Sequence, residues 1–127
     1  MAINTRQKGD VGENVACRYL VNKGYVVLER NYRKKWGEID IITTKDKIIH
    51  FIEVKSVMVK NLYDFDSHRP EDNVNSLKIS HIRRMVQTYF NEKTLSYDNG
   101  FAFHVICVYL NSVTRKAKVN MIENIIL

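Results

Sequence analysis

Two short runs of the sequence place charged side chains inside stretches that otherwise have the apolar pattern of buried β-strands. They are residues 37–42 (GEIDII), with Glu38 and Asp40, and residues 51–55 (FIEVK), with Glu53 and Lys55. Successive side chains of a strand point to opposite faces, so the two charged side chains of each run share one face. Charged groups are rarely buried unless they are paired or bind an ion. The pattern therefore predicts a functional site within a sheet.

The chemistry of this site depends on whether the two strands are neighbours. If they are, Asp40 and Glu53 can hold one hard divalent cation with Lys55 beside it. Such an arrangement is typical of a metal-dependent phosphodiester hydrolase. The alternative is that Glu53 and Lys55 form only an ion pair on a solvated sheet face.

Composition indicates a single globular domain over residues 1–127. The chain has 45% hydrophobic residues and one proline, and no apolar run approaches the roughly 18 residues of a membrane span. The polar N-terminus lacks the apolar core of a signal peptide. Cys17 and Cys107 lie in apolar patterns without ligand-spaced neighbours, which is typical of small buried hydrophobes. We therefore expect a cytoplasmic protein that makes no contact with a membrane.

The charge of the chain points to a polyanionic partner. The net charge is +6 and the pI is near 9.4, which for a small cytoplasmic protein favours nucleic acid. A basic cluster precedes the first charged run, and its members are Arg30, Arg33, Lys34 and Lys35. Tyr32 and Trp36 are interleaved with it, and cations with aromatic rings suit phosphates and unstacked bases. The alternative is that Arg33, Lys34 and Lys35 only solvate a turn.

A helix is predicted before the first strand. Asp10 is a candidate N-cap, Glu13 would complete a capping box, and Gly24 would end the helix. Glu13 also lies on the apolar side of this helix, so that its carboxylate could reach the site. Capping and membership of the site are both open for Glu13, and they do not exclude each other.

The remaining pattern predicts an α/β fold. We expect strands at 25–32, 38–44 and 48–56, a long loop at 57–73, a helix at 75–91, and strands at 101–110 and 117–122. Lys78, His81, Arg83 and Arg84 would form the polar surface of the second helix. This αβββαβ order with a terminal strand fits a mixed sheet flanked by helices.

These residues resemble the YraN-like family, which is assigned to the restriction-endonuclease-like, or PD-(D/E)xK, nuclease superfamily. The resemblance covers almost the whole chain, and its motifs are Gly12-Glu13, Gly24-Tyr25, residues 29–33, Gly37 to Asp40, residues 51–55, Val74, Lys78 and residues 122–124. Archaeal Holliday-junction resolvases show a similar layout. The resemblance implies a restriction-endonuclease-like fold with an αβββαβ core, a mixed central sheet flanked by helices, and a homodimer.

The resemblance also assigns roles to residues. Asp40 and Glu53 would bind Mg²⁺ or Mn²⁺ together with the backbone carbonyl of Val54. Lys55 would orient the attacking water or stabilise the developing charge, and Glu13 matches the helical catalytic glutamate of the resolvases.

The family motif extends these assignments and also departs from this chain. Glu38 belongs to the family's own motif and is a candidate member of the site, and Lys78 joins Arg30, Arg33, Lys34 and Lys35 as a nucleic-acid-binding candidate. The family usually has an arginine at the position of Val57 and an aspartate at that of His104.

Together these observations predict a metal-dependent nuclease that acts on DNA, with branched or otherwise structured DNA as one substrate class. The competing hypothesis is a catalytically inactive nucleic-acid-binding or interaction module on the same fold. The set of Asp40, Glu53 and Lys55 favours the enzyme, whereas Val57 favours the module.

Overall fold

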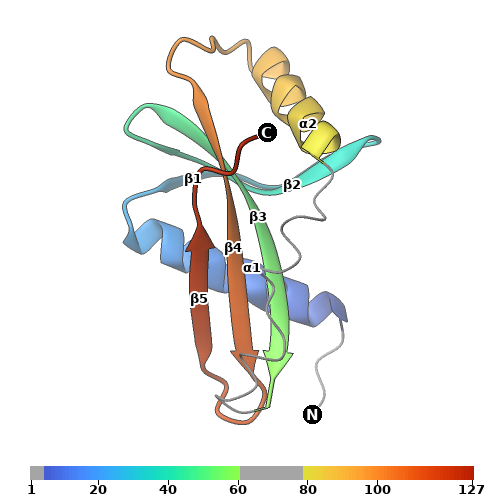
Figure 1. Ribbon diagram of the computed structural model, residues 1–127, viewed down its shortest axis with the longest axis vertical. Coiled ribbons are helices and arrows are strands. Elements are labelled where there is room, and N and C mark those ends of the chain that lie inside the picture. The colour runs from blue at the N-terminus through green and yellow to red at the C-terminus, as the bar shows by residue number, and fades with distance from the viewer. Residues whose placement is uncertain (1–4, 61–78) are drawn as a thin grey trace.

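The computed structural model describes residues 5–60 and 79–127, and Figure 1 shows their arrangement. The elements follow in the order α1 (Thr5–Asn22), β1 (Val26–Lys34), β2 (Gly37–Lys45), β3 (Ile48–Val59), α2 (Ile79–Glu92), β4 (Phe101–Asn111) and β5 (Ala117–Ile122). This is the order predicted from the sequence. No helix in these ranges is long and apolar enough to cross a membrane.

The strands form one mixed sheet in the order β1-β2-β3-β4-β5. β1, β2 and β3 are antiparallel neighbours, β3 and β4 are parallel, and β5 returns antiparallel to β4. The parallel pair requires a crossover, which contains α2. The predicted mixed α/β fold is therefore confirmed.

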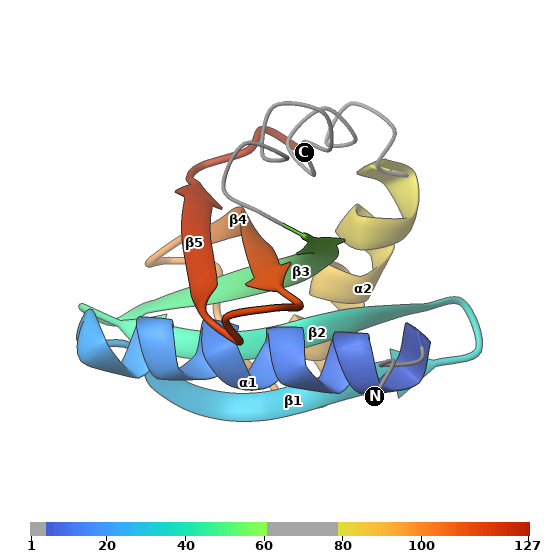
Figure 2. The ribbon, with the colours of Figure 1, turned by 90° about the horizontal axis from the view of Figure 1, so that it is seen from below.

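Each helix covers one face of the sheet, and Figure 2 shows α1 along one side with α2 on the other. Ala16 and Leu20 of α1 pack in a core that also contains Tyr25, Ile41, Ile52, Ile106, Val108 and Leu110. On the other face, Met85, Val86 and Phe90 of α2 pack with residues that include Ile39, Ile42, Phe51 and Phe103. Ile41 and Ile42 are both fully buried because the strand carries a core on each face.

Local signals fix two of the connections. Gly24 has a φ of +94° and ends α1, while the Tyr25 amide donates to the Leu20 carbonyl in the hydrogen-bond pattern of a Schellman motif. Asp46 and Lys47 both have positive φ between the paired residues Lys45 and Ile48. Two such residues match the twist of a two-residue hairpin, as the sequence predicts.

Two sequence predictions need correction. α1 begins at Thr5, so Asp10 is not its N-cap and Glu13 does not form a capping box. The intervening residues 6–8 (RQK) are good helix formers and extend the helix upstream. β3 continues to Val59, because residues 57–59 pair with β4, so the predicted loop begins later. Residues 61–73 of that loop and the predicted start of α2 at 75–78 lie outside the described residues.

α1 lies close against β3 at Gly12. A Cβ placed on Gly12 would lie 3.0 Å from Ser56 Cβ and would overlap its hydroxyl oxygen. Gly9, one turn earlier, has nothing within 4 Å of an added Cβ. The absence of a side chain at Gly12 therefore sets the distance between the helix and the sheet, and with it the position of the adjacent Glu13.

We expect Gly12→Ala to lower the free energy of unfolding by about 1–3 kcal/mol, because overpacking forces α1 away from β3. Gly9→Ala is the matched control and should raise stability by up to about 1 kcal/mol, since alanine favours the helix. Adding Ser56→Ala to Gly12→Ala should recover part of the loss. Urea unfolding measures all three, and equal effects at both glycines would contradict the close approach.

Candidate functional site

The site lies where β2 and β3 separate. Their antiparallel pairing ends at Ile41 and Ile52, and Asp40 and Glu53 would be the next pair if it continued. Instead, the Val54 amide donates a 2.7 Å hydrogen bond to Asp40 Oδ2. The aspartate side chain thus satisfies a strand amide at the point of separation. Figure 1 shows β2 crossing β3 at a steep angle beyond this point.

Four carboxylates interact electrostatically around this separation: Glu13 from α1, Glu38 and Asp40 from β2, and Glu53 from β3. Three of them have a cationic partner. The pairs are Glu13 Oε1 with Arg30 Nη2 at 3.6 Å, Glu38 Oε2 with Arg33 Nε at 3.0 Å, and Glu53 Oε1 with Lys55 Nζ at 3.9 Å. Within residues 5–60 and 79–127, no cationic side chain lies within 4 Å of Asp40 as an ion-pair partner.

Asp40 consequently carries the strongest electrostatic perturbation of the four. Burial, with a further contribution from Glu53, Glu13 and Glu38, raises the pKa of Asp40 to about 7 against the lowering effect of the Val54 hydrogen bond. A bound cation stabilises the charged form of a carboxyl group that is buried beside other carboxylates, because the cation can take the place of the proton. Of the four carboxylates, Asp40 is therefore the one whose charged form is most disfavoured in this structure.

Glu53 and Lys55 are neither fully buried nor on an open surface. Their side chains are 33% and 24% exposed, and burial raises the pKa of Glu53 while Lys55 lowers it. The neighbouring Val54 packs in the core under α1, and Ser56 lies against Gly12. Because side chains alternate along β3, Glu53 and Lys55 point away from α1.

Glu13 belongs to the same electrostatic group. Its Oε1 atom is buried without a hydrogen bond, and its contact with Arg30 is long for an ion pair at 3.6 Å. Burial raises the pKa of Glu13, and Arg30 opposes this effect. With the capping role removed by the start of α1, Glu13 is an incompletely satisfied carboxylate whose negative charge acts on Asp40.

The predicted basic cluster lies on β1 and its hairpin turn. Beyond the pairs of Arg30 and Arg33, the Lys34 ammonium forms an ion pair with Glu92 at the end of α2. Lys35 is exposed at the turn. Three of the four cations therefore already have carboxylate partners within the protein. Lys78 lies outside the described residues.

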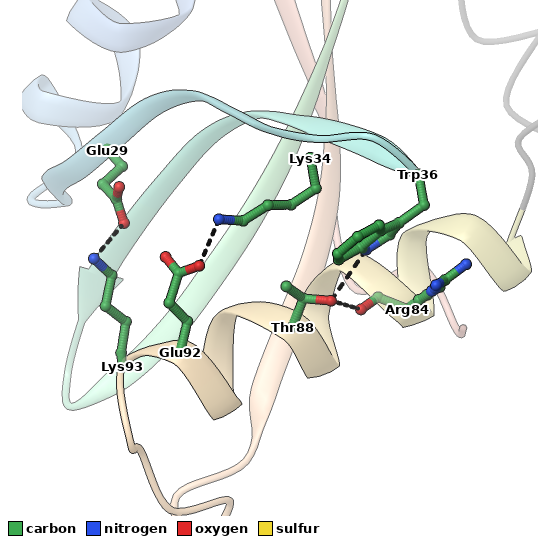
Figure 3. A network of polar contacts seen from close by, with 7 residues as sticks. All are labelled: Glu29, Lys34, Trp36, Arg84, Thr88, Glu92 and Lys93. Carbon is green, nitrogen blue, oxygen red and sulfur yellow. Dashed lines mark hydrogen bonds and ion pairs between the residues drawn. The ribbon is translucent and has the colours of Figure 1, made fainter.

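The two aromatic rings of this cluster pack against α2. Tyr32 is 6% exposed and packs edge-on against Tyr89. Trp36 Nε1 donates to Thr88 Oγ1 at 3.2 Å, and the Arg84 guanidinium carbon lies 4.7 Å from the Trp36 ring centroid (Figure 3). The expectation that these rings meet unstacked bases is therefore wrong for the buried Tyr32, and it stays a prediction for the partly buried Trp36.

The sequence did not reveal one polar contact in the core, between His50 of β3 and His104 of β4. His50 Nδ1 and His104 Nε2 are 2.8 Å apart, and the Asn124 amide donates to His104 Nδ1 at 3.0 Å. His104 is therefore neutral, with its proton on Nε2. Burial, together with the adjacent His50, lowers the pKa of His104 to about 4. Both histidines interrupt apolar runs, but their contact depends on strand register that the sequence does not show.

The protein donors present at the site are few. Among the described residues, no three His, Cys, Asp or Glu side chains are grouped closely enough to hold a metal ion by themselves. A cation at Asp40 and Glu53 would need backbone, water or ligand oxygens as well. Mg²⁺ is commonly bound in this way, through one or two carboxylates.

The fold and the site together define a mixed α/β domain with carboxylates and a lysine at the separation of two central strands. The chain belongs to the uncharacterised protein family UPF0102, whose family model matches residues 12–108. A UPF0102 protein of Campylobacter lari is 38% identical over 98% of both chains. A UPF0102 protein of Clostridium botulinum strain 657 is 37% identical over 91% of this chain and 90% of its own.

We expect Asp40→Asn to stabilise the metal-free protein at pH 8. The unfolded carboxyl titrates near pH 4 and the folded one near pH 7, so the folded state binds more protons between these values and loses stability as pH rises. Asparagine removes this penalty and can still accept the Val54 hydrogen bond. The gain should be on the order of 2 kcal/mol at pH 8 and much smaller at pH 4.5.

Urea unfolding in the presence of a chelator, at both pH values, measures this effect. The matched control is Asp98→Asn, which neutralises an exposed acid outside the site. A gain from Asp40→Asn that is the same at pH 4.5 and pH 8 would contradict the shifted titration.

Proposed function

We propose that the protein is a metal-dependent nuclease that hydrolyses phosphodiester bonds in DNA, on a fold of the restriction-endonuclease-like kind. The observation that carries the proposal is the Asp40 carboxylate at the separation of β2 and β3, with Glu53 and Lys55 beside it. The αβββαβ order and the mixed sheet are consistent with this class. A carboxylate pair with a neighbouring ammonium is the minimum that phosphodiester hydrolysis requires.

Asp40 and Glu53 would hold a Mg²⁺ or Mn²⁺ ion together with the backbone carbonyl of Val54. The donors fit because they are hard oxygens and because the pKa of Asp40 is about 7, raised first by burial and then by the neighbouring carboxylates, so that a bound cation would stabilise its charged form. The bound ion would supply Lewis-acid activation of water and phosphate. Phosphate and water oxygens would complete its coordination.

The other charged side chains of the site would stabilise charge on the phosphate or position the attacking water. The Lys55 ammonium, 3.9 Å from Glu53, can stabilise the negative charge that develops on the phosphate oxygens. Glu13 can orient a water from the side of α1, and the Arg30 guanidinium partly neutralises the negative charge of the Glu13 carboxylate. Glu38 is held by Arg33 and adds negative potential at Asp40.

Two positions where this chain departs from the family pattern lie in the core and not in the site. Val57 is a partly buried hydrophobic that packs against the core under α2. His104 is 2% exposed and is held by His50 and Asn124. Val57 supplies no basic side chain where the family usually has arginine, and His104 supplies no carboxylate where the family usually has aspartate. The apolar Val57 is the observation that favours the competing function, an inactive nucleic-acid-binding or interaction module.

Asp40→Ala and Glu53→Ala should each abolish binding of Mn²⁺, because oxygen ligands dominate affinity for hard ions. Isothermal titration calorimetry measures this directly. The matched control is Asp46→Asn, which removes an acid from the β2–β3 turn at a positive φ that asparagine adopts easily. Unchanged Mn²⁺ affinity in Asp40→Ala would remove Asp40 from the site.

Lys55→Met should reduce cleavage by at least about 100-fold and leave Mn²⁺ binding intact, because it removes a charge that acts in the transition state. Cleavage is measured on linear and branched DNA with Mg²⁺ or Mn²⁺. Lys116→Met, an exposed lysine after β4, is the control. Wild-type protein that binds DNA and metal but cleaves none of these substrates would establish the binding module instead.

A further inference from the structure

The outer surface of α2 is basic and lies next to the candidate site. From Ile79 to Asn91 the helix contains no acidic residue, and Arg83 and Arg84 are both exposed. Lys35 is exposed at the tip of the β1–β2 hairpin, which packs beside α2. We call Lys35, Arg83 and Arg84 the arginine surface.

The position of Arg84 is set by contacts from both elements, which Figure 3 shows together. Its guanidinium lies over the Trp36 ring, and its backbone carbonyl accepts a 2.8 Å hydrogen bond from Thr88 Oγ1. A guanidinium that stacks through its face keeps its N–H edges available for a planar anion. Arg84 is thus preorganised to bind phosphate without the cost of ordering a mobile side chain.

The arginine surface differs from the basic residues of β1. Arg30, Arg33 and Lys34 face Glu13, Glu38 and Glu92 respectively, so that each pair contributes little net charge. To bind phosphate they would first have to give up these partners. Arg83 and Arg84 have no acidic neighbour within their own helix until Glu92, which is paired with Lys34.

We propose that the arginine surface binds the phosphate backbone of double-stranded DNA. The proposal rests on the proposed nuclease function and names its substrate class. A Cβ on Gly37 would lie 2.9 Å from Met85 Cγ, so the start of β2 contacts α2 directly. Gly37 lies three residues before Asp40 on β2, so the strand that contacts α2 continues to the candidate site.

The aromatic residues argue for a duplex over a single strand. Binding of single strands relies on rings that stack on unpaired bases. Tyr32 is buried, and Trp36 has Arg84 over one face and Thr88 at its indole nitrogen. Within residues 5–60 and 79–127, the rings of the basic cluster thus already make contacts inside the protein, which suits a regular double-stranded backbone.

The test is fluorescence anisotropy with a labelled 20-base-pair duplex in a chelator, where no cleavage can occur. Wild-type protein should bind the duplex more tightly than a single strand of the same length. Arg83→Gln with Arg84→Gln should make the slope of log affinity against log salt shallower by about 1.8, or about 0.9 per lost contact. At 0.1 M salt this corresponds to about 60-fold weaker binding.

The matched control is Arg115→Gln with Lys116→Gln, which removes the same charge from the exposed turn between β4 and β5, away from α2 (Figure 1). It should change the slope much less. Arg84→Lys keeps the charge and should keep the slope, which separates a lost phosphate contact from a displaced helix. Circular dichroism confirms that α2 is retained.

Three results would overturn the proposal: no binding of wild type to the duplex, equal slope changes in the two double variants, or tighter binding to the single strand that is lost in Trp36→Leu. A different result would overturn the proposed nuclease function and leave the DNA-binding surface in place. Protein that binds the duplex through Arg83 and Arg84 but cleaves no DNA with Mg²⁺ or Mn²⁺ would keep the surface and lose the nuclease.

Discussion

The hydrogen bond from the Val54 amide to Asp40 Oδ2 is the interaction on which the site depends. A strand amide that loses its ladder partner must find another acceptor, because an unsatisfied buried amide costs about 1–3 kcal/mol. Asp40 supplies this acceptor, so β2 and β3 can separate after Ile41 and Ile52. The separation turns the β1–β2 hairpin toward α2 and leaves the Glu53 side chain beside the gap.

The same interaction places negative charge where the fold does not neutralise it. Arg30, Arg33 and Lys55 each pair with one carboxylate, while Asp40, within the described residues, is bound by the Val54 amide and has a pKa of about 7. A protein under selection for stability alone would replace such a group with a neutral one. That the chain retains Asp40 despite this cost in stability is consistent with a carboxylate that acts through a bound cation.

Much of the fold could be predicted from the sequence because the local patterns agree with the tertiary structure. Gly24, the Asp46-Lys47 turn and the apolar stripe of α2 are short-range signals, and each held. The start of α1 was missed because the Asp10 to Glu13 capping pattern is equally compatible with the interior of a helix. The contact between His50 and His104 was missed because it joins residues 54 positions apart through strand register.

For the site as well, the residue types could be predicted from the sequence but their interaction partners could not. The sequence predicted that charged groups would gather around β2 and β3, but it could not show which cations are paired within the fold. A run such as Arg33-Lys34-Lys35 reads as one basic patch, yet Glu38 and Glu92 bind two of its members. Charge available to a polyanion is the charge that remains after internal pairing. Among the residues that the structure describes, Lys35, Arg83 and Arg84 are exposed cations near this hairpin for which no carboxylate partner is seen, and Trp36 holds one of the two guanidinium groups in place.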